Sequence, residues 1–298
     1  MLSECDDKLN LWLADSATEA ATLTLNNLID DSTREDDMKR SRRLAILVIG
    51  STVLFVVTSC RRQPARNRLN ENQFPLVMLW AWERPEDLSF LDSHKYGVAF
   101  LAQTLTLKGD EVVLNPRHQP LQVPPDIKMM AVTRIESQKI TGQKPALSAS
   151  QRQQLVKLIL RTLERGSVSA IQIDFDALVS ERDFYRALLQ DLRAQLPDNV
   201  SLSMTALASF CIGDRWLDDL PVDEAVPMIF RMGADDRVVK NMLAGGRDFR
   251  EPLCRTSYGI ALDEPLEMKR ERARRLYVFN DRSWSESSVR ELQERWLQ

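Results

Sequence analysis

The sequence predicts an α/β fold, a TIM-like (β/α)8 barrel with an irregular second unit. The main observation is that residues 74–298 contain eight strand-like runs, most of them separated by amphipathic helical patterns. The runs cover residues 76–82, 98–102, 128–135, 170–176, 201–206, 225–231, 257–261 and 276–280. A doubly wound open sheet is the alternative, but no Gly-rich phosphate-binding turn follows any run, which disfavours it.

The helical patterns are clearest on either side of the fourth run. Residues 150–165 place Leu155, Ile159 and Leu163 on one stripe, and residues 181–196 show the same periodicity. These patterns predict helices that pack one apolar face against the sheet. Further helices are expected over residues 235–243, 267–275 and 286–297.

The connection between the second and third runs differs from the others. Residues 104–107 and 111–114 flank Lys108-Gly-Asp110, as in a β-hairpin, and a Pro-rich stretch follows. The second unit is therefore expected to lack a regular helix.

The fourth run contains the most informative pattern of the chain. Apolar and polar residues alternate strictly, with Ile171, Ile173 and Phe175 on one face and Gln172, Asp174 and Asp176 on the other. Both faces of a parallel strand are normally buried, and buried carboxylates are costly unless they open onto a cleft. The run therefore predicts a functional site, with Asp174 and Asp176 as candidate catalytic residues and Gln172 as a candidate ligand contact. A structural pair bonded to neighbouring strands is the alternative.

Other candidate site residues follow from the rule that functional side chains gather at the carboxyl ends of barrel strands. The first run ends with Trp80 and Trp82 on one face, followed by Glu83; aromatic rings beside carboxylates are suited to sugars. Trp80 could equally be a core residue. Arg231, at the end of the sixth run, is expected to face the two aspartates and keep them ionised.

Composition excludes several function classes. The net charge of −3 conceals an acidic stretch, residues 1–37, with ten acidic and two basic residues, and a basic one, residues 38–59, with four basic residues. Residues 60–298 are nearly balanced and show no basic patch with interleaved aromatics, so no nucleic-acid partner is expected. With only two histidines, both in early loops, and no metal-ligand spacing among the cysteines, no metal or cofactor is expected.

Residues 38–60 have the organisation of a signal segment. A basic start and an apolar run of about 15 residues end in Val57-Thr-Ser-Cys60, which is similar to a bacterial lipobox. This pattern predicts that Cys60 is lipidated and that the barrel lies in the cell envelope, outside the cytoplasm. It also suggests that Met38 is the true start and that residues 1–37 are an overrun or a disordered extension. A signal anchor with a cytoplasmic acidic tail is the alternative.

Residues 61–73 are polar and are expected to form a tether to a barrel domain over residues 74–298. Within that domain, Cys211 and Cys254 form either a disulfide or two buried free thiols.

Two resemblances to known protein families narrow the range of possible functions. Gln172-Ile-Asp-Phe-Asp176 and Leu202-Ser-Met-Thr-Ala-Leu207 resemble two strands of an uncharacterised bacterial lipoprotein family with a domain of unknown function. That resemblance covers roughly residues 74–280 and implies an exported, barrel-like domain of unproven activity.

The chain also resembles, more distantly, the chitinase-type glycoside hydrolase barrels. Their Asp-x-x-Asp-x-Asp-x-Glu strand falls on Ser169, Gln172, Asp174 and Asp176, where only Asp174 is identical and Asp176 replaces the acid Glu. Their Met-x-Tyr-Asp sequence falls on Met228-Ile-Phe-Arg231, which loses the phenol and reverses the charge. These departures argue against chitinase activity itself.

Two functions remain open. As a glycosidase-like hydrolase, the protein would use Asp176 as acid and Asp174 to orient it, with Trp82 stacking on a sugar. As a binding or assembly protein, it would use the same residues and Arg231 to hold a glycan or an envelope partner without turnover.

Overall fold

The computed structural model describes residues 68–71, 74–140 and 142–297. The predicted N-terminal extension, the signal segment with Cys60 and most of the tether lie outside these residues. Among the described residues, no helix combines the length and apolar character that crossing a membrane requires.

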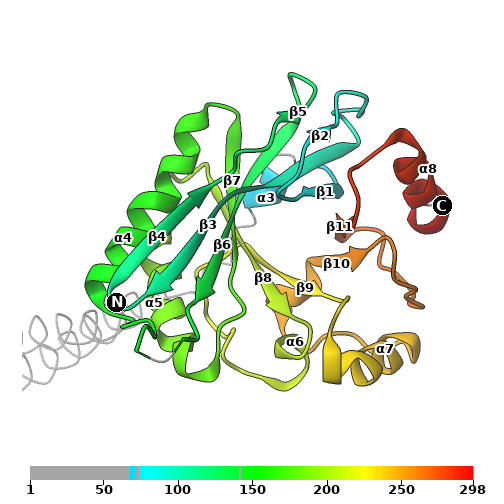
Figure 1. The fold of residues 1–298 in the computed structure, drawn as a ribbon. Helices are drawn as coiled ribbons and strands as arrows, with labels where there is room; N and C mark the ends of the chain where they lie inside the picture. Colours follow the sequence, from blue (N-terminus) through cyan, green and yellow to red (C-terminus); the bar gives the residue numbers. More distant parts are fainter. Residues whose placement is uncertain (1–67, 72–73, 141, 298) are drawn as a thin grey trace, which may run out of the picture. The chain divides into compact units, whose positions relative to one another are not determined.

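Eight parallel strands close into a barrel, as predicted (Figure 1). Their order around the barrel is β1, β3, β6, β7, β8, β9, β10 and β11, and β1 closes it by pairing with both β3 and β11. The strands are β1 (Val77–Ala81), β3 (Tyr96–Lys108), β6 (Lys128–Ser137), β7 (Val168–Asp174), β8 (Ser201–Leu207), β9 (Glu224–Met228), β10 (Ser257–Ala261) and β11 (Arg275–Phe279). Each of the eight predicted runs overlaps one of these strands.

The second unit is irregular in the way the sequence predicts. Strand β3 turns at Gly109, which has a φ of +54°, and continues as the antiparallel strand β4 (Glu111–Pro116). A small second sheet then pairs β2 (Glu86–Asp87) with β5 (Leu121–Gln122). No helix of the described chain lies between β3 and β6.

Helices cover the outside of the barrel. Figure 1 shows α4 (Ala149–Leu160) and α5 (Arg182–Gln195) on the left, and α7 (Asp236–Ala244) and α8 (Glu286–Trp296) on the right. The helix α4 begins at the N-cap Ser148, whose hydroxyl accepts the Gln151 N–H at 3.1 Å. Short segments complete the order: α3 (Arg68–Glu71), α6 (Phe210–Gly213), η1 (Arg161–Arg165), η2 (Val179–Glu181), η3 (Gly233–Asp235) and η4 (Pro252–Arg255).

The alternation of β7 determines which side chains face which layer. Ile171 and Ile173 pack into the large hydrophobic core between the barrel and the helices, whereas Gln172 and Asp174 belong to the inner face. A separate inner cluster that includes Met78, Met130 and Val226 fills the barrel, so its middle is a packed core rather than a channel.

One predicted helix is wrong. Residues 267–275 form an irregular connection that ends where β11 begins at Arg275. The apolar residues Leu266 and Met268 are two positions apart, so this segment has no 3.6-residue stripe to bury and no reason to become helical.

The two cysteines of the barrel domain form a disulfide. The Cα atoms of Cys211 and Cys254 are 5.9 Å apart, 43 positions apart in sequence. The first of the two alternatives left open by the sequence is therefore the one in the structure.

The amino-terminal end of the barrel is closed by a buried ion pair. The Glu224 carboxylate lies 3.3 Å from the Arg275 guanidinium and accepts hydrogen bonds from Tyr277 and, at 3.0 Å, from Ser203. Arg275 also donates to the Pro75 carbonyl at 3.0 Å. Both charges are at least 97% buried, and each has several partners within the protein.

Candidate functional site

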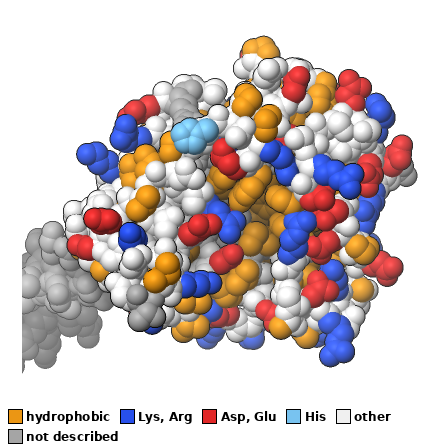
Figure 2. All heavy atoms as spheres, viewed as in Figure 1, with side chains coloured by type: hydrophobic (Ala, Val, Ile, Leu, Met, Phe, Trp, Pro, Cys, Tyr) orange, Lys and Arg blue, Asp and Glu red, His pale blue; other side chains and the backbone are white. Residues whose placement is uncertain are grey.

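A pocket of about 420 Å³ opens at the carboxyl end of the barrel. Residues from β1, β6, β7, β8, β9 and β11 line it, together with the segment that follows β9. Figure 2 shows a hollow of hydrophobic side chains near the middle of the viewed face, bordered by acidic and basic side chains. A concave, mostly apolar site with a few polar groups at this end is where barrel proteins bind their ligands.

Four aromatic rings form one wall of the pocket. Trp80 and Trp82 come from the end of β1, Phe230 follows β9, and Phe279 ends β11. Phe230 and Phe279 stack with centroids 5.6 Å apart, and Phe279 meets Trp82 edge-on at 6.2 Å. The wall presents apolar ring surfaces of fixed orientation, because each ring packs against another.

The floor of the pocket is held by a chain of hydrogen bonds. The Trp80 indole donates to the Gln172 side-chain oxygen at 2.8 Å, and the Gln172 amide donates to Ser203 at 3.0 Å. Ser203 then donates to Glu224 at the amino-terminal end. Gln172 lines the pocket, but its side-chain oxygen and nitrogen are both engaged within the protein, with Trp80 and Ser203.

Asp174 is the buried carboxyl of the site. It is 6% exposed, accepts a hydrogen bond from Thr205 at 2.7 Å, and lies 3.6 Å from the Arg134 guanidinium. Burial raises the pKa of the Asp174 carboxyl above its ordinary value, and the Thr205 hydrogen bond and the Arg134 charge offset only part of that rise. This carboxyl is therefore suited to carry a proton at a higher pH than an exposed aspartate.

Asp176 lines the same pocket but lies in a different environment. Strand β7 ends at Asp174, so Asp176 stands beyond the sheet, exposed at the rim of the pocket. Two carboxyl groups, one buried and one exposed, thus border one cavity.

Arg231 lines the pocket, but it does not pair with the two aspartates as the sequence suggested. Its guanidinium lies 3.0 Å from Asp263 and stacks 4.9 Å from the centre of the Phe279 ring. Strand β9 ends at Met228, and Arg231 adopts a φ of +50°, so the chain has turned away from the strand direction before this residue. The cation beside Asp174 is instead Arg134, on the neighbouring strand β6.

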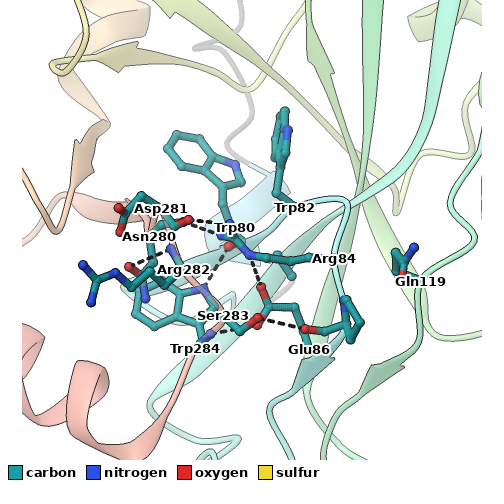
Figure 3. Close-up of polar contacts among 12 residues, drawn as sticks. Trp80, Trp82, Arg84, Glu86, Gln119, Asn280, Asp281, Arg282, Ser283 and Trp284 are labelled. Atoms are coloured by element: carbon teal, nitrogen blue, oxygen red, sulfur yellow. Dashed lines mark hydrogen bonds and ion pairs between the residues drawn. The ribbon is translucent and has the colours of Figure 1, made fainter.

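Hydrogen bonds connect the loop after β1 with the loop after β11 (Figure 3). The Arg84 guanidinium contacts Glu86 at 2.8 Å and the carbonyl groups of Asn280 and Asp281. The second Glu86 oxygen accepts the Trp284 backbone N–H at 2.8 Å. In Figure 3 the rings of Trp80 and Trp82 point to the same side, away from this cluster, which holds the backbone that carries them.

Glu83 does not line the pocket. Its carboxylate accepts the backbone N–H of His118 at 3.2 Å, on the outer side of the loop. Strand β1 ends at Ala81 and the chain bends at Glu83 and Arg84, where the Arg84 N–H donates to the Trp82 carbonyl at 2.9 Å, so the strand alternation does not extend to Glu83.

The structure thus brings together Gln172, Asp174, Asp176, Trp82 and Arg231, and it leaves Glu83 outside. The sequence reasoning missed Arg134, Phe230, Phe279 and Asp235. Arg134 and Phe279 could have been found, because each continues the inward alternation of its strand after Val132 and Tyr277. Phe230 and Asp235 follow the end of a strand, where no periodicity indicates direction.

Comparison with known proteins does not identify a family for this chain. No family model matches the chain, so the resemblance to the family of unknown function stays a prediction, and no curated protein matches either. A crystal structure of the Bacillus cereus spore cortex-lytic enzyme SleL is similar over 62% of this chain, with 16% sequence identity and a TM-score of 0.38. The matched part corresponds to half the length of that enzyme. Within the described residues, no group of three or more His, Cys, Asp or Glu side chains is arranged to hold a metal ion.

Proposed function

We propose that this protein binds a glycan in the pocket at the carboxyl end of its barrel. The observation that carries the proposal is that four aromatic rings and the carboxyl groups of Asp174 and Asp176 line one cavity. A sugar ring has an apolar face of C–H groups, which packs on aromatic rings, and hydroxyl groups, which donate to carboxylates. The cavity volume falls in the range of about 300–1,000 Å³ that is typical of small-molecule sites.

Glycan-array binding by the full-length chain tests this proposal, with Trp82→Ala as the variant that removes part of the wall. Trp216→Ala is the matched control, because Trp216 is also half-buried but packs against Tyr185 and Phe210, away from the pocket. We expect binding that Trp82→Ala weakens and Trp216→Ala preserves. An array without any bound glycan would refute the proposal.

Hydrolysis of the bound glycan is the second candidate function, and the different environments of the two aspartates favour it. A carboxyl with a raised pKa is the better proton donor, so Asp174 takes the role of acid, and the exposed Asp176 faces the substrate as the second carboxyl group. This assignment reverses the roles suggested by the resemblance to chitinases. Binding without turnover is favoured by the shorter side chain at position 176, which sets its carboxyl group on the order of 1 Å further back than a glutamate would.

The two functions can be separated by mass spectrometry of a bound oligosaccharide after prolonged incubation. Cleavage that is lost in both Asp174→Asn and Asp176→Asn, at a glycan concentration that saturates each variant, supports hydrolysis. An oligosaccharide that stays intact with the wild-type protein leaves binding as the function.

We further propose that the barrel lies outside the cytoplasm and is anchored through a lipid on Cys60. The disulfide between Cys211 and Cys254 supports export, because disulfides persist mainly in oxidising compartments. Labelling of cells with a radioactive fatty acid tests the anchor. Incorporation should be lost in Cys60→Ser, and incorporation that persists in this variant would contradict lipidation at Cys60.

A further inference from the structure

We infer that the glycan taken by this pocket carries a free, protonated amine, as a de-N-acetylated amino sugar does. The inference rests on the glycan-binding function proposed above and specifies its ligand class.

Two carboxylates of the pocket have no cationic partner within the described residues. Asp176 follows β7, and Asp235 ends the short η3 segment after β9, so they approach the cavity from different parts of the barrel. No lysine, arginine or histidine side chain of the described chain lies within ion-pair distance of either one.

Both arginines of the pocket, by contrast, already have carboxylate partners. Arg134 lies 2.8 Å from Glu136 and 3.6 Å from Asp174, and Arg231 lies 3.0 Å from Asp263. The cation that follows on the adjacent helix, Lys240, is held in the same way, at 2.9 Å from Asp236 and 3.6 Å from Glu264. Each of these three cations is therefore paired with at least one carboxylate.

The pocket consequently presents an excess of negative charge to its ligand. An anionic sugar would meet Asp176 and Asp235 as like charges, because the arginines are already paired. A neutral sugar would displace water from these carboxylates and replace it with hydrogen bonds from hydroxyl groups only. An ammonium group would replace the water with a charge-assisted hydrogen bond. The preference for an ammonium group therefore rests on the two carboxylates, because the aromatic rings already have cations beside them: Arg134 lies 5.9 Å from the centre of the Trp82 ring, and Arg231 lies 4.9 Å from that of Phe279.

The test compares two oligosaccharides that differ only in acetylation, tetraglucosamine and tetra-N-acetylglucosamine. Their binding to the full-length protein is measured by calorimetry at mildly acidic pH, where the sugar amines are protonated. We expect the free-amine form to bind at least about tenfold more tightly, and this preference to fall as salt is added.

Variants assign the preference to the two carboxylates. Asp176→Asn and Asp235→Asn should each reduce the ratio of the two affinities, whereas Asp126→Asn, an exposed aspartate outside the pocket, should leave it unchanged. Equal or tighter binding of the acetylated form would overturn the inference while leaving glycan binding intact. The inference also fails if neither oligosaccharide binds while other glycans do; if no glycan binds at all, the proposed function fails with it.

Discussion

The two ends of the barrel both contain carboxylates and arginines, but they use them differently. At the amino-terminal end, Glu224 and Arg275 are buried against each other and against Tyr277, Ser203 and backbone carbonyls. At the carboxyl end, Asp176 is exposed beside an open cavity without a cationic partner among the described residues. Charges that pair with one another inside the protein stabilise the barrel. A charge without a partner inside the protein is available to bind a ligand.

The largest effect should come from breaking the ion pair at the amino-terminal end. Glu224→Ala leaves Arg275 buried without its counter-charge, and we expect it to lower the free energy of unfolding by about 3–5 kcal/mol. Urea denaturation at neutral pH measures this loss. Glu136→Ala is the matched control at the other end, because it removes an exposed partner of Arg134 and should cost less than about 1 kcal/mol. If Glu224→Ala and Glu136→Ala lowered the free energy of unfolding equally, the proposed difference between the two ends of the barrel would be contradicted.

A second effect tests whether the amino-terminal network acts as a unit. Tyr277→Phe removes the hydroxyl that donates to the Glu224 carboxylate and leaves the ring in place. We expect a loss of about 1.5–3 kcal/mol in urea denaturation, because hydrogen bonds to charged groups are worth about that much. A variant as stable as the wild type would show that the contacts with Ser203 and Arg275 are enough to stabilise the buried Glu224 carboxylate.

At the carboxyl end, Asp174→Asn should have a smaller effect on stability, with a sign that depends on pH. Burial raises the pKa of Asp174 in the folded state above its unfolded value. Its contribution is therefore fully present below the unfolded pKa and is lost as pH rises through the folded pKa. Asparagine does not ionise and can still accept the Thr205 hydrogen bond, so the variant should gain stability relative to the wild type as pH rises. Urea denaturation over a pH series measures the difference, and a difference that does not change with pH would contradict this account.

The subtlest effect concerns Arg134, which lies beside Asp174 on the neighbouring strand. Removing its charge in Arg134→Gln should raise the pKa of Asp174 further, because the guanidinium is one of the groups that oppose the effect of burial. Carbon NMR titration of the aspartate carboxyl groups measures the shift. An unchanged pKa of Asp174 in this variant would show that Glu136 neutralises the Arg134 guanidinium, so that Arg134 has no effect on Asp174.

Much of the fold was predictable because strand alternation is a local property. In the fourth run, the period of two separates Ile171 and Ile173, which face the helices, from Gln172 and Asp174, which face inward. The same local logic fails for residues 267–275, where charged residues of good helix propensity form an irregular connection because no apolar stripe accompanies them.

The sequence by itself determined the eight strands and the run that contains the candidate site, because hydrophobic periodicity records which residues face the core. Only the tertiary structure decided which side chains contact one another. That Arg134, rather than Arg231, lies beside Asp174 depends on the register between β6 and β7. That Trp80 donates to Gln172 depends on how two strands 92 residues apart meet across the barrel. Contacts of this kind arise from the closure of the sheet, and no spacing along the chain encodes them.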